Sequence, residues 1–240
     1  HHVAHWKLDE TADDALGNFA GAIRGEPIWH EGHTNQAVQL DGQNDYIEVP
    51  VLNLNTDTLT ICAWINASAQ DVDIPGIVMC RTGQTVAGIN LFGNRLRYHW
   101  NDLSETYDWD SGFTIPENGW VFVALTVQPD KGTLYLYDED GLKSAENRIV
   151  HTVEEFDGPL CIGRDGGFND RYFKGMIDDV QLFTFPLTRS QIEEIAKGRE
   201  VDLGGSLAQI QLVDADLVPA GQSLEDIAAE AEKSFADNEK

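Results

Sequence analysis

Residues 119–141 read GWVFVALTVQPDKGTLYLYDEDG, and this stretch decides the fold class. Two runs rich in Val, Leu, Thr and aromatic residues are separated by the cluster QPDKG, and a second cluster, EDG, follows them. β-branched and aromatic residues favour β-strands, whereas Pro, Asp and Gly favour turns. The stretch therefore predicts two short β-strands with a turn between them.

The same pattern recurs along most of the chain. Further strand-like runs are AVQLDG (37–42), DYIEVP (45–50), TLTICAWI (58–65), GIVMCRT (76–82), GINLFG (88–93), RLRYHW (95–100), GPLCIGR (158–164) and GMIDDVQLF (175–183). Many short strands with turn clusters between them, and no long helices among them, predict a β-sandwich or jelly roll. One short helix is expected near 188–197, capped by Thr188 or Ser190 and ended by Gly198.

The sequence changes character after about residue 200. Residues 223–240, SLEDIAAEAEKSFADNEK, predict an amphipathic helix because Ser223 and Asp226 have capping-box spacing and apolar residues share one face. We therefore expect two parts, a jelly-roll domain of residues 1–200 and an acidic extension of residues 201–240 that carries a C-terminal helix.

The charge balance excludes some classes of partner. The chain has 41 Asp and Glu against 16 Lys and Arg, a formal net charge of −25. Such a surface repels phosphate backbones and anionic membranes and attracts divalent cations or basic proteins, although solubility alone is an equally good explanation. We expect no nucleic-acid partner. We also expect no membrane insertion, because no apolar run reaches the roughly 18 residues that a span needs.

The three cysteines, Cys62, Cys80 and Cys161, form no CxxC pair and so give no support to a zinc or thioredoxin-type site. A hairpin turning near residue 71 would place Cys62 opposite Cys80. A disulfide between them is one interpretation, and small buried apolar side chains are the other.

The stretch RLRYHWNDLSETYDWDSG (95–112) mixes aromatic rings with polar acceptors. Sugar-binding sites use this combination, because apolar sugar faces stack on rings while hydroxyl groups bond to acids and amides. The candidate glycan ligands are Tyr98, Trp100, Asn101, Asp102, Tyr107 and Trp109. The alternative is structural: Trp100 and Trp109 pack on the sandwich and fix the loop. Trp64 is assigned to the core.

Several motifs, taken in order, resemble those of LamG-like, concanavalin A-like jelly-roll domains of bacterial secreted and envelope proteins. They are HWKLDE (5–10), DDALGNFAGAI (13–23), AVQLDGQNDYIEVP (37–50), LTICAWI (59–65), GPLCIGRD (158–165) and YFKGMIDDVQLFTFPLTRSQIEEI (172–195). The resemblance runs from about Trp6 to Gly198. It implies a sandwich of two antiparallel sheets, makes 119–141 the central hairpin, and implies a secreted, periplasmic or cell-envelope location.

The resemblance also implies a structural Ca²⁺ ion. In many such domains an Asp of the first loop and an Asp of the last strand bind one ion together with backbone carbonyls. The matching residues are Asp14 and Asp178, with Asn18 of the same loop as a further candidate ligand. Ca²⁺ prefers oxygen ligands, so carboxylates and loop carbonyls suit it. The alternative is that Asp178 caps a bulge or accepts hydrogen bonds from turn N–H groups.

The family resemblance includes glycoside hydrolases, which need two carboxylates flanking the scissile bond. The enzymes of the family carry them as E-x-D-x-x-E or E-x-D-x-E on one strand, and neither pattern occurs here. WHEGH (29–33) spaces its histidines at i and i+3 around Gly32, which favours a surface loop over a zinc site. We therefore expect no catalytic residues and no enzyme activity.

Two interpretations of function stay open. The first is a calcium-stabilised binding or adhesion module that recognises a glycan or a protein at the cell surface. The second is a structural or assembly subunit whose acidic tail docks on a partner chain of a larger envelope complex, with Ile227 and Phe235 as anchors.

Overall fold

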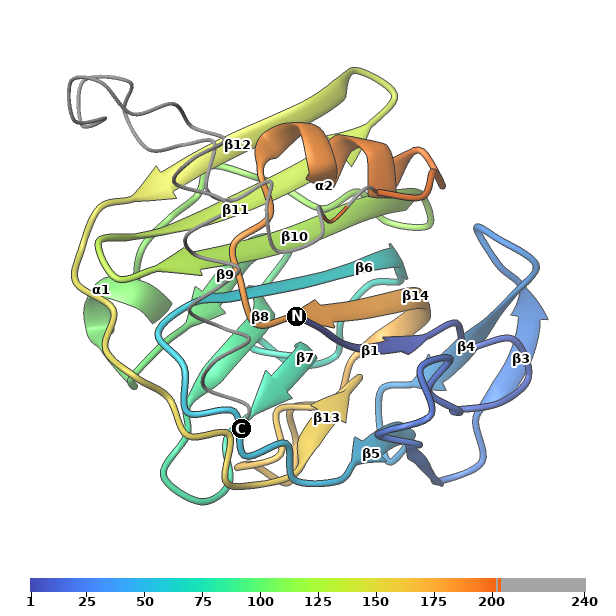
Figure 1. Ribbon diagram of the computed structural model, residues 1–240. Coiled ribbons are helices and arrows are strands. Elements are labelled where there is room, and N and C mark those ends of the chain that lie inside the picture. Colours follow the sequence, from blue (N-terminus) through green and yellow to red (C-terminus); the bar gives the residue numbers. More distant parts are fainter. Residues whose placement is uncertain (202, 204–240) are drawn as a thin grey trace, which may run out of the picture. The chain divides into compact units, whose positions relative to one another are not determined.

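The computed structural model describes residues 1–201 and 203. Its strands form two antiparallel sheets (Figure 1), which confirms the predicted all-β, concanavalin A-like jelly-roll sandwich. The eight-stranded sheet has the order β12 (Gly141–Asn147), β11 (Lys131–Asp138), β10 (Trp120–Gln128), β6 (Leu59–Ala67), β14 (Lys174–Phe183), β4 (Gln36–Asp41) and β3 (Ile28–Glu31), and β1 (His2–Trp6) pairs with β14. The six-stranded sheet has the order β2 (Ala22–Arg24), β5 (Tyr46–Val49), β13 (Leu160–Ile162), β7 (Gly76–Cys80), β8 (Ala87–Phe92) and β9 (Arg95–His99).

The stretch 119–141 forms β10 and β11, as its composition predicts. The two strands pair from Phe122 opposite Tyr137 to Gln128 opposite Lys131. Successive residues of a strand point to opposite faces of a sheet. Alternate residues of β10, from Val121 to Val127, accordingly belong to the core between the two sheets.

The predicted short helix is α2 (Arg189–Ala196). Thr188 is its N-cap and forms a capping box with Gln191, while Ile192 and Ile195 are buried. A second helical segment, α1 (Ser104–Tyr107), is a single turn inside the aromatic loop. No sequence pattern indicated it.

The prediction that a hairpin places Cys62 opposite Cys80 is wrong. Cys62 lies on β6 of the eight-stranded sheet and Cys80 on β7 of the six-stranded sheet, because the chain changes sheets between them. All three cysteines are free and buried. Burial raises the pKa of each thiol, so they act as small apolar side chains.

The start of the chain pairs with the last strand of the sandwich. Trp6 of β1 lies opposite Val180 of β14, and the Thr184 N–H donates to the His1 carbonyl over 3.0 Å. One compact unit spans His1–Gly198, and a second begins at Arg199. The helix predicted in residues 223–240, and the docking proposed for it, lie outside the described residues.

Candidate functional site

Two of the predicted glycan ligands are buried. The side chains of Tyr98, on β9, and Trp100, just after it, are 0% exposed. The Tyr98 hydroxyl lies 3.0 Å from His151 Nε2, and Trp100 Nε1 donates to the Thr152 carbonyl over 2.7 Å. Both polar atoms are thus satisfied inside the protein. A side chain without exposed surface cannot contact a sugar, so this corrects the assignment of Tyr98 and Trp100 as ligands and supports the structural alternative for Trp100.

Asn101, another predicted ligand, holds the loop in place. Its Oδ1 accepts a hydrogen bond from the Thr152 N–H over 2.9 Å. Its own N–H donates to Glu154 Oε1 over 2.7 Å, and the same oxygen accepts from the Val86 N–H over 3.2 Å. Burial raises the pKa of the Glu154 carboxyl. The backbone of Asn101 has a φ of 52°, a left-handed conformation that Asn tolerates well.

The remaining predicted ligands keep exposed surface. The Asp102 side chain is 63% exposed and Tyr107 is 36% exposed. Trp109 is half-buried against the core, with its ring 5.9 Å from that of Tyr98. The structure thus separates the predicted set into buried residues that fix the loop and exposed residues that can contact a ligand.

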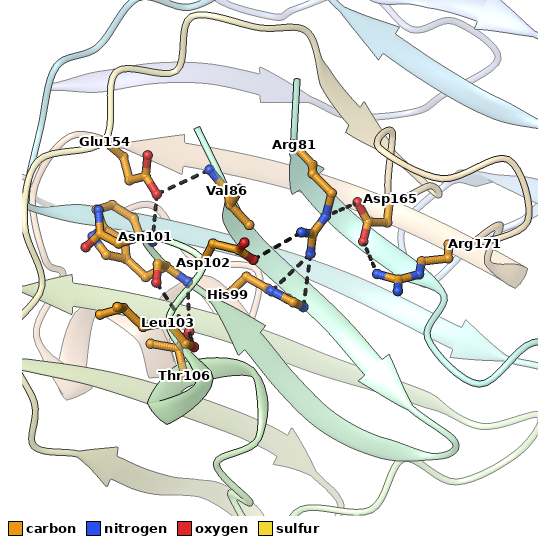
Figure 2. A network of polar contacts seen from close by, with 11 residues as sticks. Arg81, Val86, His99, Asn101, Asp102, Leu103, Thr106, Glu154, Asp165 and Arg171 are labelled. Carbon is orange, nitrogen blue, oxygen red and sulfur yellow. Dashed lines mark hydrogen bonds and ion pairs between the residues drawn. The ribbon is translucent and has the colours of Figure 1, made fainter. Parts of the chain in front are cut away.

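Asp102 belongs to a polar network on the outward side of the six-stranded sheet (Figure 2). Its centre is Asp165, which is fully buried. Arg81 Nε donates to one Asp165 oxygen over 2.7 Å, and Arg171 Nη1 donates to the other over 3.0 Å. Arg81 also reaches Asp102 Oδ1 at 3.4 Å. One buried carboxylate therefore orients two guanidinium groups.

His99 completes this network. Arg81 Nη2 lies 3.0 Å from His99 Nδ1, and an arginine can only donate, so that ring nitrogen accepts. Burial and the positive charges of Arg81 and Arg171 lower the pKa of His99 to about 3. The ring is therefore neutral at physiological pH and serves as an acceptor.

Two exposed aromatic rings flank these charged groups. The Phe168 ring is 39% exposed, and its centroid lies 5.3 Å from the Arg81 guanidinium and 3.4 Å from that of Arg171. The Tyr107 ring lies 5.4 Å from the His99 ring. We call the set Arg81, His99, Asp102, Tyr107, Phe168 and Arg171 the Tyr107–Phe168 strip. It presents ring faces, guanidinium donors and a carboxylate acceptor side by side.

Sequence reasoning missed four of the six residues of this strip, namely Arg81, His99, Phe168 and Arg171. Arg81 directly follows β7, whereas Asp165, Phe168 and Arg171 belong to the loop between β13 and β14. The Arg81–Asp165 contact joins residues 84 positions apart. The motif GPLCIGRD (158–165) contributed only to the family resemblance, and no spacing rule connects it to Arg81.

Both oxygens of the predicted metal ligand Asp14 are occupied by backbone N–H groups of β1 and of its own loop. Its Oδ1 accepts from the N–H groups of His5 and Leu16 over 2.8 and 3.0 Å. Its Oδ2 accepts from those of Asn18 and Phe19 over 2.9 and 3.0 Å. Asp14 therefore orders this loop, and Asn18 contributes a backbone N–H to it.

Asp178 has the opposite character. It is 1% exposed, and its Oδ2 accepts from the Thr34 N–H over 2.9 Å, while its Oδ1 is buried without a hydrogen-bond partner. Burial, together with the charges of Asp179 and Asp9, raises the pKa of Asp178 to about 7. The pairing of β14 with β6 shifts register between Asp178 and Gln181, so Asp178 does begin a bulge, as the alternative interpretation proposed.

The predicted ligands Asp14, Asn18 and Asp178 fit a calcium site only in part. The orphaned Oδ1 of Asp178 suits a cation, and Asp9 is close enough to raise the pKa of Asp178. Among the described residues, no hydrogen bond or ion pair connects Asp14 with Asp178. Within residues 1–201 and 203, no three His, Cys, Asp or Glu side chains are arranged to hold a metal ion.

Comparison with known proteins gives a family and a set of folds. Residues 41–193 match the Laminin_G_3 family model, described as concanavalin A-like lectin/glucanases superfamily. No curated protein matches the sequence. Among the helices of the described residues, none has the length and apolar composition of a membrane span.

Solved structures share the sandwich at low sequence identity. Domain 4 of AbnA, an extracellular GH43 arabinanase of Geobacillus stearothermophilus in complex with arabinotriose, is 20% identical, with a TM-score of 0.66 over 81% of this chain and 98% of that one. The binding domain of botulinum neurotoxin serotype G is 13% identical, with a TM-score of 0.60 over 82% of this chain and 51% of the toxin domain. The binding domain of botulinum neurotoxin DC, in complex with rat synaptotagmin II, is 14% identical, with a TM-score of 0.59 over 82% of this chain and 51% of that one. These likenesses show the fold.

Proposed function

The chain belongs to the concanavalin A-like lectin/glucanases superfamily, and from that membership we propose that it is a carbohydrate-binding module without catalytic residues. The observation that carries the proposal is the Tyr107–Phe168 strip. Its two exposed rings offer faces on which a sugar ring stacks, and Arg171 and Asp102 offer donors and an acceptor for hydroxyl groups.

The strip is built as a rigid site. Asp165 is fully buried and anchors both arginines, so their orientation does not depend on the ligand. A carboxylate committed to two guanidinium groups is a poor general acid, because glycoside hydrolysis needs a carboxyl group that can donate a proton to the leaving oxygen. The arrangement supports binding rather than hydrolysis.

The likeness to a domain that holds arabinotriose supports a glycan ligand, and the likeness to a toxin domain that holds synaptotagmin keeps a protein ligand as the competing possibility. Adhesion to a cell surface, and a secreted, periplasmic or envelope location, belong to the same proposal. The assembly interpretation depends on the tail beyond residue 203 and stays a prediction.

We also propose that Ca²⁺ stabilises the sandwich at Asp178. Asp178 would supply the carboxylate, with Asp9 as the neighbouring acid, and the ion would neutralise a buried negative charge. Asp14 and Asn18 lack this support, because their loop already satisfies the Asp14 oxygens.

A glycan array that includes arabino-oligosaccharides tests the binding proposal. We expect saturable binding by the parent and at least about tenfold weaker binding by the Tyr107→Ala/Phe168→Ala double variant, because each lost aromatic contact is worth roughly 1 kcal/mol. Phe92→Ala is the matched control, since Phe92 is also an exposed ring (52%) and lies outside the strip. Unchanged binding by the double variant would move the site elsewhere, and silence across the array would favour a protein ligand.

A further inference from the structure

The opposite face of the sandwich holds a polar recess of about 330 Å³. Strands β3, β4, β6 and β14 line it, together with the segment that precedes β10. The side chains used below are Glu31, Gln39, Asn66, Ser68, Asn118 and Met176. We call this the amide recess. A volume near 300 Å³ is at the lower end of the range for ligand pockets.

The strand register places this recess on the outward side of the eight-stranded sheet. Gln39 lies opposite Met176, Met176 opposite Asn66, and Asn66 opposite Trp120. These residues therefore form one row across β4, β14, β6 and β10. Their chain neighbours, such as Val38 and Ile177, belong to the core, so the row faces away from it. The Tyr107–Phe168 strip lies on the outward side of the other sheet.

The polar side chains of the recess are unused. Within residues 1–201 and 203, Glu31, Gln39 and Asn118 are exposed and Asn66 is half-buried, and none of these four side chains makes a hydrogen bond to the protein. Other amides of the same domain are committed. Gln70, for example, donates to the carbonyls of Ser68 and Lys174.

The backbone fixes where these free groups stand. Gln39 and Asn66 belong to paired strands. Asn118 has a φ of 56°, and its N–H donates to the Ala67 carbonyl over 2.7 Å. The backbone positions are therefore fixed before a ligand arrives, and only the rotamer freedom of the side chains is lost on binding.

The composition of the recess selects one class of ligand. An amide side chain offers both donors and an acceptor, as does each hydroxyl group of a sugar. No Lys or Arg lines the recess, and the Glu31 carboxylate would repel an anion. A single carboxylate is too few for a multivalent cation. Met176 supplies the one apolar side chain, enough for the face of a sugar ring but not for a lipid.

We propose that the amide recess is a second ligand site, which binds one residue of a neutral sugar. This goes beyond the strip, because the two sites lie on opposite sheets and share no residue. A module with a glycan site on each face can hold two polysaccharide chains together.

The test is an NMR titration of the ¹⁵N-labelled full chain. The probes are the methyl glycosides of glucose, galactose, mannose, N-acetylglucosamine, xylose and arabinose. The side-chain NH₂ signals of Gln39, Asn66 and Asn118 report on the recess directly, and that of Gln43, an exposed amide in a turn, is the internal control. We expect at least one sugar to shift the three recess signals saturably and to leave the Gln43 signal in place.

Variants complete the design. Gln39→Ala/Asn118→Gly removes two amides, and glycine retains the left-handed backbone at position 118. We expect it to weaken the titration of the Asn66 signal by about tenfold or more. Gln43→Ala and Tyr107→Ala/Phe168→Ala are expected to leave that titration unchanged. Loss of sugar binding at the amide recess is therefore distinguishable from loss of binding at the Tyr107–Phe168 strip.

Two results would overturn the proposal: no saturable shift of the three signals with any of the six sugars, or an unchanged titration in the Gln39→Ala/Asn118→Gly variant.

Discussion

Replacing Trp100 by Phe tests whether this residue belongs to the core or to the ligand site. The side chain is 0% exposed and Nε1 donates to the Thr152 carbonyl over 2.7 Å. Phenylalanine retains an aromatic ring but removes the donor and leaves part of the indole volume empty.

The expected cost follows from these two losses. A buried carbonyl left without its donor costs about 1–3 kcal/mol. A residual cavity of roughly 40 Å³ adds about 1 kcal/mol. We therefore expect Trp100→Phe to lower the free energy of unfolding by about 2–4 kcal/mol.

Urea unfolding followed by far-UV circular dichroism measures this change, with equal m-values required for a valid comparison. Tyr107→Phe is the control. Tyr107 is exposed, so we expect a change within about 0.5 kcal/mol. The reasoning would be refuted if Trp100→Phe unfolded like the parent. It would also be refuted if the variant lost glycan binding while its stability stayed that of the parent, because Trp100 would then act on the ligand and not on the core.

Two further predictions concern titration and metal binding. Because the pKa of His99 falls from 6.5 to about 3 on folding, only the unfolded chain takes up this proton on acidification. The free energy of unfolding of the parent, relative to that of His99→Gln, should therefore fall by about 2 kcal/mol between roughly pH 6.5 and pH 5. If this difference between the two proteins did not vary with pH, the burial of a neutral His99 ring would be contradicted. For calcium, we expect Ca²⁺ to raise the unfolding temperature of the parent and of the exposed control Asp13→Asn, but not that of Asp178→Asn. In EDTA at pH 8, above the raised pKa of about 7, Asp178→Asn should unfold at a higher temperature than the parent, because the parent then buries an ionised carboxylate. Equal responses to Ca²⁺ in the parent and Asp178→Asn would place any ion elsewhere.

Local patterns predicted most of the strands, because alternation and turn clusters are properties of neighbouring residues. They missed β2, β3 and β12, and β3 includes residues 29–31 of the segment WHEGH that was expected to be a surface loop. The burial of Tyr98 and Trp100 could have been read from the same rule. Leu96, Tyr98 and Trp100 alternate with Arg95, Arg97 and His99, so the two sets face opposite sides of β9. The aromatic cluster indicated a sugar site, whereas this periodicity indicates that Tyr98 and Trp100 belong to the core.

Long-range contacts were beyond the reach of the sequence. Adjacent acids in a strand do signal an irregularity, and β14 is indeed bulged after Asp178. Their partners could not be foreseen, because Thr34 lies 144 positions from Asp178 and His5 lies 174 positions from Asp179. The sheet change between β6 and β7 is equally invisible in composition, because both strands are mostly apolar.

The pairing of β1 with β14 has a mechanical consequence. The two strands run antiparallel, and the start of one meets the end of the other, where the Thr184 N–H bonds to the His1 carbonyl. A force that pulls these two points apart loads the hydrogen bonds one after another, as in a zipper, and never all at once. We therefore expect this seam to open at low force and to expose the ring of Trp6, which is buried in the folded domain. A tether attached through these two points would lengthen before the sandwich itself unfolded.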